Sequence, residues 1–125
     1  MTLARAIEIV KADAVVAPPN GQVELSGCFA ADLMSDVLAF ARSGALLITG
    51  LTSDQTVRTA MIKHLPAVLI IEGKDVGVEM VEAAREQEIA VFRTPLSKFE
   101  TCGLLMQAGL RAARRSGAYP AEGGR

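Results

Sequence analysis

Three short apolar runs constrain the fold of this chain more than any other feature of its sequence. They read ALLITG, AVLII and IAVF, and each is followed by a polar turn and then by a stretch with helical character. Leu46, Val68 and Ala90 hold equivalent places in these runs and lie 22 residues apart, the size of a compact strand-plus-helix unit. Strands that are apolar on both faces belong in a parallel sheet covered by helices. The sequence therefore predicts an α/β fold, a three-layer α/β/α sandwich whose mostly parallel sheet is built from consecutive βα units.

The segments before these units are less regular. Apolar residues at helical spacing predict a short helix over residues 2–11, and a strand over residues 14–17 ends at the turn signal PPNG. Residues 22–30, QVELSGCFA, fit either a second strand or an irregular extended segment. A helix is expected over residues 33–44, with Asp32 at its N-cap.

The predicted starts of the later helices carry capping residues. Thr52 with Gln55 and Ser97 with Glu100 have the spacing of capping boxes, and Asp75 is expected to cap the helix between them. Each of these caps follows one of the apolar runs. They therefore support the division into βα units.

The length of 125 residues suits one domain with a single core. We expect that domain to occupy residues 1–110. Residues 111–125 are small, basic and rich in turn formers, which predicts a flexible C-terminal tail. Its arginines could contact an acidic partner, but a solvated chain end is the simpler interpretation.

Charge and hydropathy exclude several classes of partner. A net charge of −1 gives no general attraction to nucleic acid, and four Phe, one Tyr and no Trp leave little for base stacking. The longest apolar runs are too short to span a bilayer, and charged residues interrupt the N-terminal stretch that a signal peptide would need. We expect a cytoplasmic protein without nucleic-acid or membrane partners.

No catalytic or metal-binding pattern stands out. The one histidine, His64, lies at the end of a predicted helix, where the helix dipole favours it. Neither a phosphate-binding loop with its lysine nor a Gly-x-Gly-x-x-Gly pattern occurs. Cys28 and Cys102 fit a reduced compartment as two packed thiols, with a redox pair as the open alternative. The sequence therefore predicts no catalytic residue, no metal site, no cofactor and no enzyme activity.

A candidate ligand site lies in the turns that follow the predicted strands. In an open parallel sheet, ligands bind beyond the carboxyl ends of the strands. The turn residues there that could bind an anion through backbone amides, hydroxyls or positive charge are Thr49, Gly50, Thr52, Ser53, Lys74 and Arg93. Capping and turn formation also account for the turn glycine and the hydroxyl residues, and the residues alone favour these local roles over ligand binding.

Two helices are too apolar to be covered by so small a domain. The stretch LMSDVLAFA and the last predicted helix are apolar around most of their circumference. Such a helix is either fully buried or shared with a partner, so these helices indicate a homodimer. The interface residues that this reasoning selects are Met34, Val37, Leu38, Phe40 and Leu105.

The order of segments from the first helix to about Leu110 resembles the DRTGG domain family. The likeness is carried by DLMSDVLAF, LLITG and PLSKFETCGLL, and Thr49-Gly50 matches the threonine-glycine part of the family motif. An aspartate is present as Asp32 or Asp36, but no arginine follows either one. The family occurs beside CBS domains and in phosphate acetyltransferases, and it is related to the N-terminal domain of HPr kinase. The resemblance adds Asp32 to the candidate ligand site.

The resemblance implies an α/β/α domain with a role in regulation or assembly. The leading hypothesis is a non-catalytic module that homodimerises and senses an anionic metabolite such as an adenine nucleotide. One alternative is a scaffold subunit that docks onto a metabolic or redox enzyme complex and binds no small molecule. The other is a minor enzyme, a phosphotransferase relic, whose activity substitutions of Thr49 and Asp32 would abolish.

Overall fold

The computed structural model describes residues 1–19 and 21–114, which form five helices and one five-stranded sheet. The elements, in chain order, are α1 (Leu3–Ile9), β1 (Asp13–Val16), β2 (Gly27–Ala30), α2 (Met34–Phe40), β3 (Ala45–Thr49), α3 (Asp54–Ile62), β4 (Ala67–Ile70), α4 (Val78–Gln87), β5 (Ala90–Arg93) and α5 (Lys98–Gln107). The three apolar runs form β3, β4 and β5, and each is followed by a helix as predicted. Of residues 22–30, only the last four form a regular strand.

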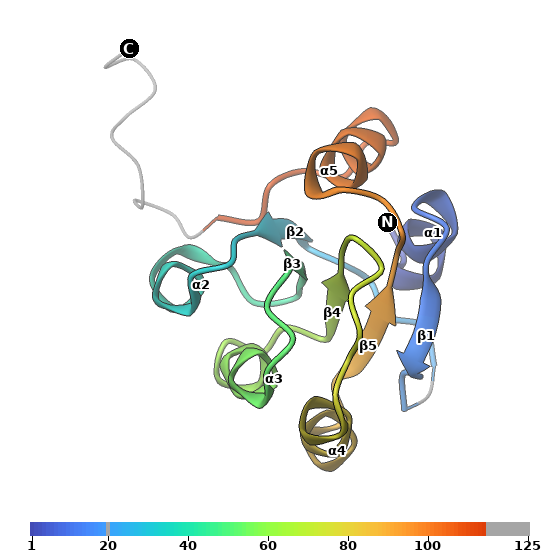
Figure 1. Ribbon diagram of the computed structural model, residues 1–125. Helices are drawn as coiled ribbons and strands as arrows, with labels where there is room; N and C mark the ends of the chain where they lie inside the picture. The colour runs from blue at the N-terminus through green and yellow to red at the C-terminus, as the bar shows by residue number, and fades with distance from the viewer. Residues whose placement is uncertain (20, 115–125) are drawn as a thin grey trace.

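The sheet has the strand order β1-β5-β4-β3-β2. Strands β2 to β5 are parallel to one another, and β1 pairs with β5 in the antiparallel sense at one edge. Each crossover from β2 to β5 moves to the next strand in the same direction, and right-handed crossovers of this kind gather their helices on one face. Figure 1 shows α2, α3 and α4 on one face of the sheet and α1 and α5 on the other. The predicted three-layer α/β/α sandwich is confirmed.

The central strands are buried on both faces, which explains why their sequences are apolar throughout. Leu47 and Val68 belong to the core under α2, α3 and α4, whereas Leu46 and Leu69 belong to the core under α1 and α5. All four side chains are fully buried. Burial of a leucine or valine side chain contributes roughly 1.5–3 kcal/mol, so alternate residues of each strand stabilise opposite layers.

Only one of the predicted capping boxes forms. The Ser97 hydroxyl accepts a hydrogen bond from the Glu100 amide at 3.1 Å, and the Glu100 carboxylate accepts one from the Ser97 amide at 3.0 Å. The predicted Thr52 box is wrong, because α3 begins one residue later with Ser53 at its N-cap and has no side-chain cap.

Two predicted aspartate caps are also wrong. The N-cap of α2 is Leu33, and Asp32 is directed elsewhere, as described below. The N-cap of α4 is Gly77, and Asp75 forms an ion pair with Arg93 instead. Helix α2 is also shorter than predicted, because the backbone becomes extended immediately after its last residue.

The chain after α5 continues the sheet beyond β2, so the predicted boundary of the tail at residue 111 is wrong. The Cys28 amide donates to the Arg111 carbonyl at 2.9 Å, and the Ala113 amide donates to the Cys28 carbonyl at 2.9 Å. Ala113 is fully buried. Gly27 permits this close approach, because a Cβ there would lie 2.4 Å from the Arg111 carbonyl oxygen. The predicted tail beyond residue 114 lies outside the described residues.

The predicted interface residues divide into two groups. Met34, Val37 and Leu105 are at most 3% exposed and belong to the cores of this chain, so their assignment to a partner surface is wrong. Leu38 is 42% exposed, and the half-buried ring of Phe40 lies under the guanidinium of Arg114 at 5.6 Å. A helix that is apolar all round does not reveal from its sequence which side faces the sheet.

Candidate functional site

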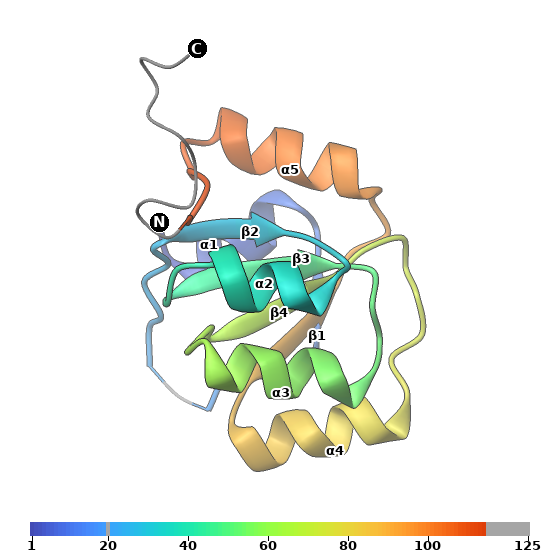
Figure 2. The same cartoon turned by 90° about the vertical axis from the view of Figure 1, so that its left-hand side faces the viewer.

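The carboxyl ends of the parallel strands bring several chain segments to one edge of the sheet. Figure 2 shows the loops after β3 and β4 at the edge toward which β2 points, and α5 begins at this edge too. The segments that meet there are the short connection after β2, the turn after β3, the loop after β4 and the first turn of α5. This is the place where open α/β sheets bind their ligands.

Asp32 lies at the centre of this edge and accepts three hydrogen bonds. Its Oδ1 accepts from the backbone N–H of Gly50 at 2.8 Å and from the Thr49 hydroxyl at 3.1 Å. Its Oδ2 accepts from Nζ of Lys98 at 2.7 Å. These donors come from β3, from the turn after it and from α5, so one carboxylate connects both layers of helices through the edge of the sheet.

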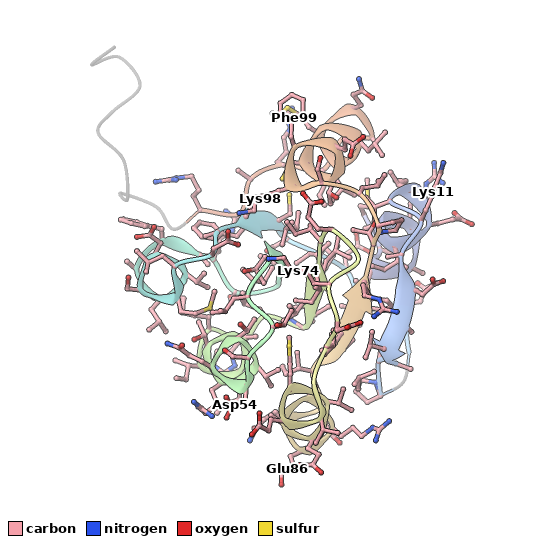
Figure 3. All side chains as sticks on the ribbon, in the orientation of Figure 1. Lys11, Asp54, Lys74, Glu86, Lys98 and Phe99 are labelled. Atoms are coloured by element: carbon pink, nitrogen blue, oxygen red, sulfur yellow. The ribbon has the colours of Figure 1, made fainter. Side chains whose placement is uncertain are left out.

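One lysine ammonium group binds this carboxylate, and a second binds the adjacent backbone. Nζ of Lys98 forms the ion pair with Asp32, and Nζ of Lys74 donates to the Gly50 carbonyl at 3.1 Å. Figure 3 shows both lysines at the same end of the molecule, with Lys74 over the strand ends. Lys74 was among the predicted residues, whereas Lys98 was missed. Its position directly after the capping residue of the last βα turn was the signal that could have found it.

The absence of a side chain at Gly50 leaves space for two charged groups. A Cβ at this position would lie 2.9 Å from Nζ of Lys74 and 3.7 Å from Oδ1 of Asp32. The glycine therefore lets two charged groups approach the backbone from different loops. Its amide and its carbonyl are both used, one by the carboxylate and the other by the ammonium group.

The environment of Asp32 favours its ionised form. The N–H of Gly50 and then the ammonium group of Lys98 lower the pKa of the Asp32 carboxyl from 3.8 to about 2, with a smaller contribution from the Thr49 hydroxyl. Partial burial acts in the opposite direction but does not prevail. The carboxylate is therefore negatively charged throughout the physiological pH range.

Three predicted site residues take other roles. Arg93, the last residue of β5, approaches Asp75 at 3.7 Å rather than Asp32. Thr52 and Ser53 are half-buried next to the start of α3, and the Ser53 hydroxyl oxygen is buried without a hydrogen-bond partner among the described residues. The structure thus brings together Asp32, Thr49, Gly50 and Lys74 from the predicted set and adds Lys98.

The two cysteines lie close enough for the charge of one to affect the other. Burial and then the neighbouring Cys102 raise the pKa of the Cys28 thiol to about 11. Burial also raises the pKa of Cys102, with Lys98 acting in the opposite direction. Both are free thiols, and at neutral pH they are protonated and therefore weak nucleophiles.

The chemistry of this edge suits an anion rather than a metal ion. Within residues 1–19 and 21–114, no group of three or more His, Cys, Asp or Glu side chains is placed to bind a metal ion. The edge offers instead a backbone amide, a hydroxyl and an ammonium group around one negative charge, with a second ammonium group on the Gly50 carbonyl, and these are the donors with which proteins bind anions. None of the helices in the described ranges is both long and apolar enough to cross a bilayer.

Comparisons with known proteins identify a fold rather than a function. No family model and no curated protein matches the sequence. A solved structure does match: the CBS and DRTGG domains of the regulatory region of Clostridium perfringens pyrophosphatase, complexed with the activator diadenosine tetraphosphate. The two sequences are 19% identical, and the structures superpose with a TM-score of 0.65. The match covers 86% of this chain and 46% of the pyrophosphatase chain, so this chain spans about half the length of its neighbour. The sandwich described here is therefore a DRTGG-like fold, as the sequence resemblance predicted.

Proposed function

We propose that this chain is a non-catalytic regulatory module that binds an anionic small molecule, such as an adenine nucleotide, at the carboxyl edge of its sheet. The observation that carries the proposal is the convergence of the Gly50 amide, the Thr49 hydroxyl and the ammonium group of Lys98 on one carboxylate, with Lys74 beside them. Proteins bind phosphate and carboxylate groups with the same donors. The Asp32 carboxylate is thus an example, within the chain, of the kind of group that this edge accepts.

Adenine nucleotides are the first ligands to test because of the structural neighbour. That structure contains a regulatory region with diadenosine tetraphosphate bound as its activator. The two lysines of this chain would supply charge for a polyphosphate. The thiols of Cys28 and Cys102 are protonated and therefore poor nucleophiles, which argues against thiol-based catalysis. Such a sensor would work in the cytoplasm, where thiols stay reduced.

The proposed module is a homodimer, and α5 supplies the best surface for association. Phe99 and Met106 on this helix are 87% and 72% exposed, and Leu104 is 36% exposed. Figure 3 shows Phe99 directed away from the sheet. A shallow groove of about 280 Å³ is lined by Phe99 and Leu104, and a Cβ at Gly103 would meet nothing within 4 Å. A second copy could therefore pack closely on this helix, as in an isologous interface.

Ligand binding can be tested by calorimetric titration with AMP, ADP, ATP and diadenosine tetraphosphate. The wild-type protein is expected to bind at least one of them, and Lys98→Met and Lys74→Met should each weaken that binding by about tenfold or more, because each removes a charge-assisted hydrogen bond. The matched control is Lys11→Met, which removes an exposed lysine on the α1 side of the molecule (Figure 3). Equal losses for all three variants would contradict a site at the carboxyl edge.

The alternative function is a scaffold subunit that docks onto an enzyme complex without a small molecule. The exposed apolar face of α5 favours it as well, because a partner enzyme could cover the same side chains. A thermal melt with the nucleotide panel and sedimentation at micromolar concentration separate the two functions. A ligand that raises the midpoint and a dimeric profile support the sensor, whereas a monomer whose midpoint no ligand moves supports the scaffold.

A further inference from the structure

Asp32 accepts from the same donors that we propose for the ligand. We infer that Asp32 is a built-in competitor at this site and that the group that displaces it is a phosphate with two negative charges. The inference rests on the proposed function and adds both the charge of the ligand and the step by which it enters.

The contacts of Asp32 are those of a bound anion. One oxygen accepts from the Gly50 amide and the Thr49 hydroxyl, and the other accepts from the Lys98 ammonium group. Its side chain is nevertheless 57% exposed, so the carboxylate lies at the opening of the site and can leave into water. Departure leaves an amide and an ammonium group to water, and an incoming anion restores a charge-assisted acceptor for both.

The balance of charge decides which anion can do so. In the observed arrangement, the single charge of Asp32 is paired with Lys98, and Lys74 beside it donates to the Gly50 carbonyl, which is a neutral acceptor. A free monoanion offers no more charge than Asp32 and competes against a tethered group whose effective concentration is on the order of millimolar. A phosphate dianion has a second charge for Lys74, so it gains an interaction that Asp32 does not have.

The backbone leaves room for this exchange. Because Gly50 has no side chain, the space beside its amide is limited by Lys74 and Asp32 themselves, 2.9 and 3.7 Å from where a Cβ would lie. A lysine ammonium group on a flexible stem can shift to a new acceptor. The incoming phosphate therefore needs movement of side chains and none of the strands.

The exchange also reaches α5. Lys98 is the first residue of that helix, and its ion pair with Asp32 joins positions 66 residues apart in the sequence. When a phosphate replaces Asp32, the direct link between the chain after β2 and the start of α5 is replaced by one through the ligand. The site is thereby connected to the helix whose outer face we propose for dimer contacts.

The test follows the amide resonance of Gly50 by NMR during titration with inorganic phosphate or acetate, at about pH 8 and constant ionic strength. In the wild-type protein, phosphate should shift this resonance and acetate should not. In Asp32→Asn, the phosphate affinity should rise by about tenfold or more, and acetate should now shift the resonance. Asp36→Asn, which removes an exposed carboxylate in the first turn of α2, should behave as the wild type does.

The possible failures are distinguishable. If Asp32→Asn binds phosphate no more tightly than the wild type and still ignores acetate, Asp32 is not a competitor, while the anion site stands. If neither anion shifts the Gly50 resonance in either protein, the proposed site is wrong and the inference falls with it. Because the new amide oxygen could still accept from Gly50, Asp32→Ala is the second variant, and the same gain in affinity is expected for it.

Discussion

Helices α4 and α5 have the same length but present different surfaces. Each has ten residues, and they lie on opposite faces of the sheet (Figure 1). The outer face of α4 is charged, with Glu79, Glu82, Arg85 and Glu86 at least partly exposed. The outer face of α5 has its largest exposed apolar side chain at Phe99, and the helix contains no charged residue after Glu100.

The inner faces of the two helices do not explain this difference. Met80 and Ala84 attach α4 to one core, and Leu105 attaches α5 to the other, all with at most 1% of their surface exposed. Both inner faces must therefore supply buried apolar side chains to the core. The outer faces differ because α4 meets water and, on our proposal, α5 meets another protein surface.

The largest expected effect tests the shared part of this comparison. Met80→Ala and Leu105→Ala should each lower the free energy of unfolding by about 3 kcal/mol, because each deletes a fully buried side chain and leaves a cavity. Urea denaturation monitored by circular dichroism measures both. If Leu105→Ala costs much less than Met80→Ala, then α5 is less firmly attached than its burial indicates, and the two helices differ inside as well as outside.

The next effect tests the outer faces. Met106→Glu on α5 and Val78→Glu on α4 introduce the same charge at side chains of nearly equal exposure, 72% and 71%. We expect Met106→Glu to raise the dissociation constant of the dimer by about thirtyfold or more, because a charge in an apolar interface loses its water. Val78→Glu should leave association unchanged, and a glutamate in the first turn is favourable there.

Sedimentation equilibrium of the two variants and the wild type provides the measurement. Phe99→Glu is the stronger version of the same test, since this ring is the most exposed large apolar group of the helix. Association that Val78→Glu disrupts and Met106→Glu leaves intact would move the interface from α5 to α4. A wild-type protein that stays monomeric would end the dimer proposal.

The comparison also indicates what the sequence could reveal. The strands β3, β4 and β5 were predictable because a strand buried on both faces must be apolar throughout, and a run of that length and composition is unfavourable on a surface that faces water. The sequence predicts that α5 is apolar but not which of its side chains are exposed. Its apolar character is visible in the sequence, but the assignment of Leu105 to the core and Phe99 to the outside depends on how the helix rotates against the sheet.

The candidate site shows the same limit. Thr49, Gly50 and Lys74 were predictable because parallel strands end at one edge, so the turns after them must be neighbours. Lys98 follows the cap of the last βα turn, which places it near this edge, but its contact with Asp32 depends on where α5 begins on the opposite face of the sheet. Asp32 was predicted as a helix cap, which is the common local role of an aspartate. Its carboxylate instead accepts hydrogen bonds from Thr49 and Gly50, which are distant in the sequence.

The smallest expected effect concerns the C-terminal ends of the two helices. Helix α5 is followed by Gly109 at φ 103°, whereas α4 ends at Glu88 with φ 57°, a left-handed conformation that a non-glycine residue adopts at a cost. Glu88→Gly should therefore raise the free energy of unfolding by about 0.5–1 kcal/mol, and Gly109→Ala should lower it by about 1 kcal/mol. Thermal and urea denaturation of both variants measure these changes.

A control two residues away separates backbone strain from the loss of a charge. Glu86→Gly makes the same substitution inside α4, where glycine is unfavourable, and should lower stability by about 1 kcal/mol. Opposite signs for positions 86 and 88 would show that the end of α4 carries the strain that Gly109 relieves at the end of α5. If both substitutions destabilise the protein equally, the two helices end in equally relaxed conformations, and their only difference lies in the surfaces that they present.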